Sequence, residues 1–323
     1  MKLTELFEQN KYIVINTDID GILSGLILVK YCKCQIVGFT NSKDKVWLAP
    51  GHNDLYGNVY VDMFVVDERV TCIDQHIVAI NNAHMQSIRN RNNIHSPQSD
   101  DINNLRVFST KGFKKKYPFG TIHYLIAKLE SEGISVTLTD LKTIVDTSLN
   151  IRLGDLLLRA DDAMKTTLNS PYTANAQQWW NWLKSLSNNA VSIQTMIDFL
   201  NTIPAANVDN IKDNTKKYFK QHFQCRTSDG GFKEITDGTG ALKPYINHYI
   251  RTVAGLLNVK GVQIPPSYNI HQGKYCRTRW LDIFANDLIQ NGKICGHTVF
   301  SYAFIYGPDN DSLTNFSFTI DMV

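Results

Sequence analysis

The sequence predicts an α/β protein that opens with a parallel doubly wound sheet and continues through a helical connector into a smaller α+β domain. An apolar run at residues 12–15 stops abruptly at a polar segment, and apolar residues then recur with helical spacing from Ile22 onward. Later apolar runs lack polar alternation, which is typical of parallel strands covered on both faces. At 323 residues the chain is long enough for two domains. We expect them at residues 1–165 and 226–323, with the connector at residues 166–225.

Three further strands are predicted in the first domain after the first helix. They are residues 35–40, 59–66 and 70–73. The middle one of these is apolar throughout except at Asp62. Residues 84–105 are rich in Asn, Arg and Ser and predict a long loop. Helical spacing returns at residues 122–129, and a further helical stretch is expected at about residues 140–165.

The connector and the C-terminal region carry a helical stripe and a hairpin. The stripe consists of Trp179, Trp182, Leu183 and Leu186, and we interpret it as core or a helix–helix contact. Residues 297–306 and 313–320 flank a turn-forming segment and predict a β-hairpin. Aromatic residues alternate onto one face of its first strand. They are Phe300, Tyr302, Phe304 and Tyr306. Such a face either covers a helix, which we favour, or stacks nucleobases.

Composition restricts the function classes. A net charge of +3 is too small to indicate nucleic-acid binding by itself. No apolar run approaches the roughly 18 residues that a membrane span needs, and the N-terminal segment is unlike a secretory signal. The six cysteines show no CxxC pair and no zinc spacing. We therefore expect a cytoplasmic protein with reduced thiols and no membrane partner.

Carboxylates follow three of the predicted strands. Asp18 and Asp20 come directly after the first strand, Asp62 interrupts the third, and Asp74 and His76 close the fourth. Because parallel strands lie about 4.8 Å apart and open α/β sheets bind ligands at their carboxyl ends, these side chains can converge on one crevice. Converging carboxylates repel each other unless a cation lies between them, which predicts one or two Mg²⁺ or Mn²⁺ ions. The alternative is that Asp18 or Asp20 merely caps the following helix.

These segments resemble the motifs of the DHH phosphoesterase superfamily. The matching residues are Asn16-Thr17-Asp18-Ile19-Asp20-Gly21 with Ser24 for the first motif, Asp62 for the second, and Asp74-Gln75-His76 for the DHH signature. The resemblance covers roughly residues 11–165, and more loosely the two-domain layout. It implies hydrolysis of phosphodiester or phosphoanhydride bonds with two Mn²⁺ or Mg²⁺ ions. It also implies a smaller C-terminal domain that holds a substrate such as a nucleotide or a short single-stranded nucleic acid.

The resemblance assigns metal-binding roles position by position. Asp18 matches the residue that binds one metal ion, Asp20 the residue that binds the other, and Asp62 the residue that bridges them. A fourth family aspartate is expected from the helical region that follows. Asp146 is the first choice for this position, and Asp155 is the second.

The signature segment supplies the catalytic candidates and the departures from the family pattern. Asp74 and His76 are the candidates, and His76 matches the histidine that lies near the scissile phosphate in the family. Asn16 stands where the family commonly has His or Asp as a metal ligand. Gln75 stands where the family has the first histidine of its signature, which is normally a metal ligand. Their amide oxygens can bind hard cations, so both remain candidate ligands, but they carry no charge and we expect weaker metal binding. The family's C-terminal glycine-rich motif is also not found.

Two other functions are compatible with these residues. In the first, Asp18 and Asp20 are the nucleophile and general acid of a phosphatase that resembles the haloacid-dehalogenase type, with Thr40 in its second motif. This alternative leaves Asp62 and Asp74 without a role. In the second, a DHH-like protein has lost catalysis and works as a sensor or binding protein, which the two amide substitutions and the missing motif favour.

Basic residues indicate where a phosphate-bearing substrate would bind. One candidate rim is Arg89, Arg91, Lys111, Lys114, Lys115 and Lys116. Further along the chain, Lys274, Arg277 and Arg279 accompany Tyr275 and Trp280. This mixture of cations and aromatic rings suits a nucleotide better than bare polyphosphate. The sequence leaves the oligomeric state open, a homodimer included.

Overall fold

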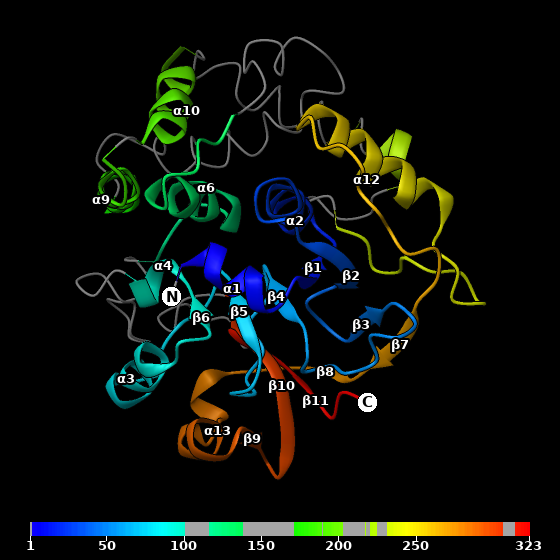
Figure 1. Ribbon diagram of the computed structural model, residues 1–323. Helices are drawn as coiled ribbons and strands as arrows, with labels where there is room; N and C mark the ends of the chain where they lie inside the picture. The colour runs from blue at the N-terminus through cyan, green and yellow to red at the C-terminus, as the bar shows by residue number, and fades with distance from the viewer. Residues whose placement is uncertain are drawn as a thin grey trace.

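The computed structural model describes residues 2–100, 116–137, 171–188, 190–202, 217, 220–224, 231–305 and 314–323. Within these residues the chain forms an α/β protein with a mostly parallel seven-stranded sheet and a separate four-stranded antiparallel sheet at the C-terminus (Figure 1). The predicted α/β class is thereby confirmed. None of the described helices is long and apolar enough to cross a membrane.

The large sheet has the order β6-β5-β4-β1-β2-β3-β7. Its strands are β1 (Tyr12–Asn16), β2 (Gln35–Thr40), β3 (Lys45–Leu48), β4 (Val59–Val61), β5 (Thr71–Ile73), β6 (Ile94–His95) and β7 (Asn269–Gln272). The five strands from β6 to β2 are parallel, whereas β3 and β7 are antiparallel to their neighbours. From β1 the chain passes through a helix to β2 and then β3 on one side, and it crosses to the other side for β4, β5 and β6. The strand order therefore reverses between β1 and β4.

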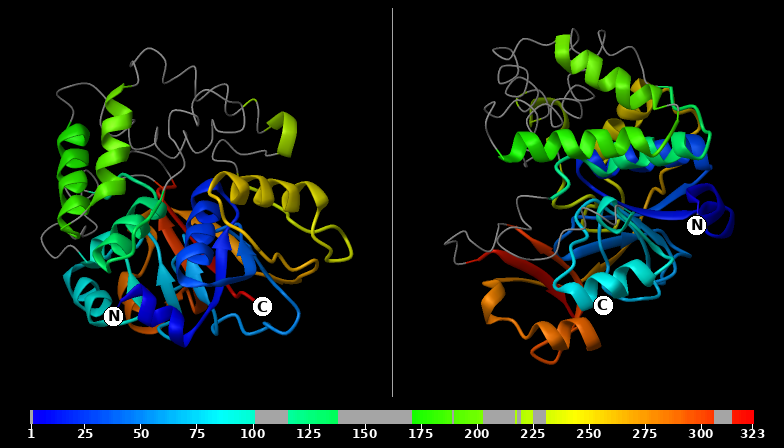
Figure 2. Two further views of the ribbon diagram at one scale, coloured as in Figure 1. Left: turned by 45° about the horizontal axis from the view of Figure 1, so that its top comes forward. Right: turned by 90° about the vertical axis from the view of Figure 1, so that its left-hand side faces the viewer.

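Helices cover the large sheet on the side away from the C-terminal strands, as Figure 2 shows. They are α2 (Ile19–Cys32), α6 (Thr121–Ser131), α9 (Pro171–Ser185), α10 (Val191–Thr202) and α12 (Pro244–Leu256), with α1 (Leu3–Gln9), α3 (Asn82–Asn90) and α4 (Pro97–Asp100) near the β6 edge. The predicted Trp stripe lies on α9, where Trp179 and Leu183 are buried in the core shared with α6.

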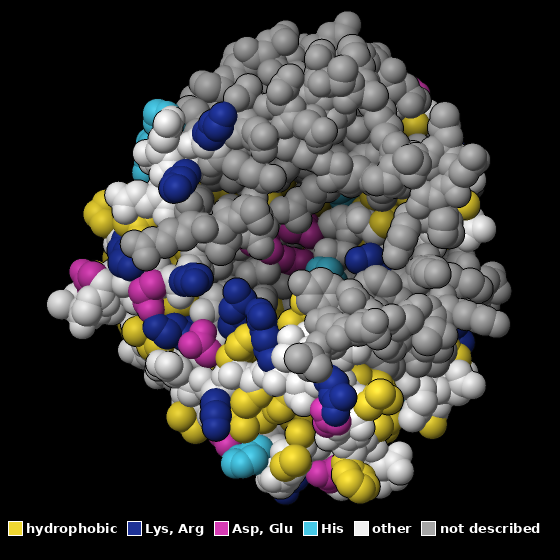
Figure 3. Space-filling model, turned by 180° about the vertical axis from the view of Figure 1, so that it is seen from behind, with side chains coloured by type: hydrophobic (Ala, Val, Ile, Leu, Met, Phe, Trp, Pro, Cys, Tyr) yellow, Lys and Arg dark blue, Asp and Glu magenta, His cyan; other side chains and the backbone are white. Residues whose placement is uncertain are grey.

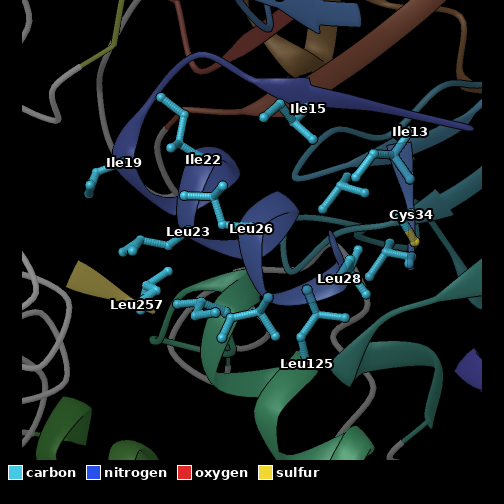
Figure 4. Close-up of a cluster of buried hydrophobic side chains, with 14 of the residues drawn as sticks. Ile13, Ile15, Ile19, Ile22, Leu23, Leu26, Leu28, Cys34, Leu125 and Leu257 are labelled. Carbon is cyan, nitrogen blue, oxygen red and sulfur yellow. The ribbon is translucent and has the colours of Figure 1, made fainter. Parts of the chain in front are cut away.

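Alternate residues of the central strands enter two separate cores. Ile13 and Ile15 of β1 belong to the core under the helices, whereas Val14 between them belongs to the core under the C-terminal sheet. In Figure 4 the apolar side chains of α2 lie between β1 and α6. Burial on both faces explains why the strands are continuously apolar.

The second sheet has the order β8-β11-β10-β9. Its elements are β8 (Lys274–Thr278), η1 (Trp280–Asp282), α13 (Ala285–Asn291), β9 (Lys293–Ile294), β10 (His297–Phe304) and β11 (Phe316–Ile320). The β10–β11 pairing confirms the predicted hairpin. Phe300 and Tyr302 of β10 make edge-to-face contacts with Tyr60 of β4 and with Phe64. These rings therefore cover the parallel sheet, and not a helix as the sequence suggested; Tyr306 lies outside the described residues.

Three element boundaries differ from the sequence expectations. The strand expected at residues 59–66 ends at Val61 because Asp62 adopts a left-handed backbone with φ of 61°. The expected loop at residues 84–105 contains most of α3, together with α4 and the two-residue strand β6. β7 comes from the region assigned to the C-terminal domain, yet it pairs with β3 of the large sheet. The segment after residue 226 therefore contributes to both sheets.

Two helical glycines provide opposite tests of this packing. A Cβ atom at Gly21 in α2 would lie 2.5 Å from the carbonyl oxygen of Asn16, whereas a Cβ atom at Gly255 in α12 would meet nothing within 4 Å. We expect Gly21→Ala to lower the free energy of unfolding by about 2 kcal/mol or more. Gly255→Ala should raise it by about 0.5–1 kcal/mol, because alanine favours the helix. Urea titrations of both variants measure these changes, and equal effects would contradict the packing described for α2.

Candidate functional site

A pocket of about 260 Å³ lies at the carboxyl ends of β1, β4 and β5. Asp18 and Asp20 follow β1, Asp62 follows β4 and Asp74 follows β5, and all four line this pocket, which we call the acid pocket. Acidic side chains are visible at the centre of the face shown in Figure 3. The pocket lies where the order of the parallel strands reverses. Open α/β sheets bind their ligands at this point, because the connections on its two sides diverge.

Asp18 and Asp20 each accept hydrogen bonds at the N-terminus of a helix. The capping alternative is confirmed for Asp18, which caps the helix that follows it, whereas Asp20 reaches a different helix. Asp18 is the N-cap of α2, and its Oδ1 accepts the Gly21 N–H at 3.0 Å. Asp20 reaches a different helix: its two carboxylate oxygens accept the N–H groups of Thr121 at 2.8 Å and Ile122 at 3.0 Å. A Cβ atom on Gly120 would lie 2.7 Å from Asp20 Oδ2, so only glycine allows this approach. Asp20 therefore fixes the start of α6 at the pocket.

Asp62 is a buried residue of the pocket lining. Its Oδ1 accepts a hydrogen bond from Thr121 Oγ1 at 2.8 Å, and its Oδ2 accepts one from Asn16 Nδ2 at 3.1 Å. The left-handed backbone at this residue is uncommon outside glycine, although aspartate adopts it more readily than most residues, and it costs on the order of 1 kcal/mol. Strained backbone of this kind concentrates at functional sites.

Mutual repulsion and burial raise the pKa values of two of these carboxyls. Burial, followed by the charges of Asp20, Asp18 and Asp74, holds the pKa of Asp62 well above its ordinary value. Burial, followed by the charges of Asp20 and Asp18, raises the pKa of Asp74 to about 7, against the backbone hydrogen bond from His76. No lysine or arginine of the described chain lines the pocket to offset this charge. The pocket therefore attracts a cation or a proton.

The signature segment lies at the pocket mouth. Asp74 is buried and its Oδ1 accepts the His76 N–H at 2.9 Å. Gln75 Nε2 lies 2.9 Å from His76 Nε2, and the Gln75 N–H donates to Thr121 Oγ1 at 3.3 Å. Thr121 therefore connects the segment to Asp62, and the five residues form one hydrogen-bonded chain.

The second sheet also lines the pocket, with hydroxyl-bearing residues among aromatic and aliphatic ones. Thr319 of β11 pairs with Ser301 of β10 on one side and with Tyr275 of β8 on the other, and all three line the pocket. Ser317 on the same face also lines it. Sequence reasoning did not identify this part of the lining, because its residues are distant in the chain and carry no motif. The only sequence signal for it is the alternation of apolar and hydroxyl residues in β11, FSFTI, which indicates one apolar face and one polar face.

The three cations predicted to bind substrate occupy different places. Arg277 pairs opposite Ser317 on the pocket-lining face, and its guanidinium lies over the Tyr275 ring at 5.4 Å. Lys274 pairs opposite Ile320, on the other face of β8. Arg279 follows β8 and is paired with Asp282 at 2.8 Å. Of the three, Arg277 shares a face with the pocket residues.

The other predicted residues are separated from the pocket or lie outside the described chain. Arg91 donates to the backbone carbonyls of Asp67 and Val70, away from the acid pocket. Thr40, which the phosphatase alternative requires, donates its hydroxyl to the Lys45 carbonyl. Some predicted residues lie outside the described residues: Asp146, Asp155, Lys111, Lys114 and Lys115.

The acid pocket has the right chemical groups for a hard divalent cation, but their side chains are not grouped closely enough to bind one together. Carboxylate oxygens are the preferred donors for Mg²⁺ and Mn²⁺, and here four carboxylate groups line one pocket. Within the described ranges, however, no three His, Cys, Asp or Glu side chains are grouped closely enough to hold one ion. Both oxygens of Asp20 are engaged by α6, which limits its part in a two-ion centre.

No family model, curated protein or solved structure matches this chain.

The raised pKa values predict that the metal-free protein loses stability as the pH rises. Between about pH 4 and pH 7 the folded chain binds more protons at Asp74 than the unfolded chain, so the free energy of unfolding falls with pH. Asp62 extends this loss to higher pH. Urea titrations in EDTA should therefore give a lower midpoint at pH 8 than at pH 6.5. Mn²⁺ should raise the midpoint at pH 8 and have little effect at pH 5.

Asp62→Asn tests how much the acid pocket contributes to the pH dependence of the free energy of unfolding, because it removes a carboxyl with a raised pKa. The variant should be more stable than the wild type at pH 8 and should flatten the pH dependence above pH 6.5. Burial lowers the pKa of His84 and of His95 to about 4. These two histidines therefore make the free energy of unfolding rise with pH, but only below about pH 6.5. Asp198→Asn, at an exposed position in α10, is the control and should leave the profile unchanged. If the stability of Asp62→Asn depended on pH as that of the wild type does, Asp62 would not be a source of this pH dependence.

Proposed function

We propose that this chain is a metal-dependent phosphoesterase that hydrolyses phosphodiester bonds of nucleotides or short single-stranded nucleic acids. The observation that carries the proposal is the acid pocket itself: carboxylates from three strand ends line one pocket at the reversal point of the sheet. The buried Asp62 in its lining, with a left-handed backbone, supports a functional rather than a structural origin for this arrangement. The DHH-like order of Asp18, Asp20, Asp62 and Asp74 along the chain supports it further.

The residues divide into those that would hold a cation and those that position them. Asp18, Asp62 and Asp74 are the candidate ligands. To hold one ion together, their side chains would have to move closer than they lie here, and Asp62 would have to release its hydrogen bonds to Thr121 and Asn16. Asp20 is less suited, since both of its oxygens accept backbone N–H groups of α6. A bound divalent cation supplies charge neutralisation for the phosphoryl group and a lowered pKa for water. Thr121 orients Asp62 through its hydroxyl. His76, at the mouth, is placed to donate a proton or a hydrogen bond to a phosphate oxygen.

Exposed cations around the turn between β2 and β3 support an anionic substrate. Ser42 of this turn lines the acid pocket, and Lys43 beside it is exposed. The Lys233 carbonyl accepts from Asn41 of the same turn, and the N–H of Gly273, next to Lys274, donates to the Asp44 carbonyl. Lys43 and Lys233 therefore belong to segments that meet beside the pocket, whereas Lys274 lies on the other face of β8. Such a rim attracts phosphates, and the attraction weakens with salt.

A binding protein without catalysis is the second candidate. It is favoured by the engagement of Asp20 with α6 and by the amide nitrogen that Asn16 directs at Asp62. Both features lower the number of carboxylate oxygens available to a pair of ions. This candidate shares the cation site with the hydrolase, so metal binding alone does not separate the two.

Turnover separates the two candidates. We expect Mn²⁺-dependent hydrolysis of at least one of bis(p-nitrophenyl) phosphate, a dinucleotide, a short single-stranded oligonucleotide and polyphosphate. Asp62→Asn and Asp18→Asn should each reduce kcat by at least about a hundredfold, since each removes a charge from the cation site. Asn at position 18 keeps the N-cap of α2, so the fold should be retained. Asp198→Asn is the matched control and should hydrolyse the substrates as the wild type does. If the folded wild type binds metal but hydrolyses none of the four substrates, the binding protein is favoured.

Tyr275 tests the nucleotide part of the proposal. Its ring lines the acid pocket beside Arg277, where a base can stack on it. Tyr275→Ala should raise KM for the dinucleotide about tenfold or more while leaving kcat/KM for inorganic tripolyphosphate, which has no base, nearly unchanged. Equal losses for both substrates would show that Tyr275 supports the pocket without contacting a base.

A further inference from the structure

The turn between β2 and β3, residues 41–44, reaches the acid pocket, and we call it the rim turn. Asn16 at the end of β1 pairs with Thr40 at the end of β2. Asp18 and Ser42 each follow two residues later, and both line the pocket. Because β2 lies next to β1 on the side away from β4, Ser42 extends the row of strand-end side chains beyond Asp18.

Ser42 has a left-handed backbone, with φ of 54°. Glycine adopts this conformation without a steric penalty, whereas a residue with a Cβ atom does not. The fold gains no hydrogen bond from the Ser42 hydroxyl, which is exposed and has no partner within the described part of the chain. Among the described residues that line the acid pocket, Asp62 is the other non-glycine residue with a positive φ. Unfavourable backbone conformations concentrate at functional sites, which indicates a role for the serine side chain in binding.

Side-chain hydrogen bonds hold the rim turn in place. Asn41 Oδ1 accepts the backbone N–H groups of residues 43–45 at 3.0, 3.1 and 3.0 Å. The Thr319 hydroxyl of β11 donates to the Lys43 carbonyl, so the turn is attached to the second sheet as well as to β2 and β3. The position of Ser42 at the pocket is therefore fixed before a ligand binds, which lowers the entropic cost of binding.

Tyr275 lies at the same end of the pocket as the rim turn. Tyr275 of β8 pairs with Thr319 of β11, and both line the acid pocket. Because Thr319 also donates to the Lys43 carbonyl, the aromatic ring and the rim turn meet at one residue of the second sheet. A nucleotide that stacks its base on Tyr275 can therefore place its phosphate group at the rim turn.

The charges at this end of the pocket favour a phosphate more than those at the other end. The unpaired charges of the rim turn and its neighbours are those of Lys43, Lys233 and Arg277 against those of Asp18 and Asp44. Lys45 and Glu234 form an ion pair, so their charges cancel. The remaining carboxylates of the row, on Asp20, Asp62 and Asp74, are negative unless a proton or a cation neutralises them. A phosphate is therefore favoured beside Lys43, and only when a cation offsets the rest of the row.

We infer that Ser42 and Lys43 bind the phosphate group of a nucleotide whose base stacks on Tyr275. The Ser42 hydroxyl donates a hydrogen bond to a phosphate oxygen, and the Lys43 ammonium group supplies a positive charge beside it. This subsite rests on the proposed function, since it requires a phosphate-bearing ligand in the acid pocket together with a divalent cation. It adds the side chains that recognise the phosphate and the end of the pocket at which the nucleotide lies.

Isothermal titration of the full chain with AMP and with adenosine, each in the presence of Mn²⁺, tests the inference. Adenosine carries the same base without the phosphate. Ser42→Gly and Lys43→Ala should each weaken AMP binding at least about fivefold, because each removes one contact to a charged group. Both variants should leave adenosine binding within about twofold of that of the wild type. Tyr275→Ala should weaken the binding of both ligands, because both carry the base.

Each variant of the rim turn has a matched control. Cys295, in the turn between β9 and β10, is exposed and left-handed with φ of 51°, and it does not line the acid pocket. Cys295→Gly and Ser42→Gly should both keep or raise the urea midpoint, because glycine adopts this backbone freely. Lys293, exposed on β9, provides the control for Lys43. Cys295→Gly and Lys293→Ala should bind AMP as the wild type does.

Three results overturn the inference. The first is AMP binding by Ser42→Gly with the affinity of the wild type. The second is an equal loss of AMP and adenosine binding in Ser42→Gly, which would show that the substitution changes the shape of the pocket. The third is absence of AMP binding to the wild type in Mn²⁺.

Failure of the proposed hydrolysis gives a different pattern. If the wild type hydrolyses no substrate of the panel but prefers AMP to adenosine through Ser42, the subsite stands and the binding protein is favoured. If the wild type hydrolyses a substrate while AMP binding is independent of Ser42, the hydrolase stands and the subsite is wrong.

Discussion

The carboxylate of Asp20 accepts hydrogen bonds from the N–H groups of Thr121 and Ile122, residues 101 and 102 positions later in the chain. A buried carboxylate needs such partners, and the N-terminus of α6 offers two N–H groups and the positive end of a helix dipole. Because this contact places Thr121 at the pocket, its hydroxyl reaches Asp62 and the backbone of Gln75. The side-chain positions around the acid pocket therefore depend on one long-range anchor.

The large sheet is buried on both faces, and this explains how two sheets can share one site. Val14, Tyr60 and Cys72 face the second sheet, while their neighbours in the same strands face the helices. The second sheet in turn directs Tyr302 and Phe318 into this core and its hydroxyl residues toward the carboxylates. The alternation of side chains along single strands thus builds a core and a pocket wall together.

The acid pocket is destabilising, and the rest of the fold compensates. Four carboxylates line one small volume, two of them with raised pKa values, and Asp62 adds a strained backbone. The surrounding cores are extensive, with the rings of Trp47, Trp179 and Tyr60 almost wholly buried. Such a local conflict within a well-packed protein is typical of sites retained for binding or catalysis. It is the physical reason for placing function here.

The amino-acid sequence alone determined the α/β class, the β1–α2 unit, β2, α6 and the β10–β11 hairpin, because each is encoded by local apolar periodicity and turn residues. It also pointed to Asp18, Asp20, Asp62 and Asp74, since strand ends are visible in the sequence. Tertiary structure alone decided that Asp20 anchors α6, that β7 joins the large sheet, and that Ser301, Ser317 and Thr319 face the carboxylates. These features arise from contacts between segments up to hundreds of residues apart, and such contacts leave no local periodicity to detect.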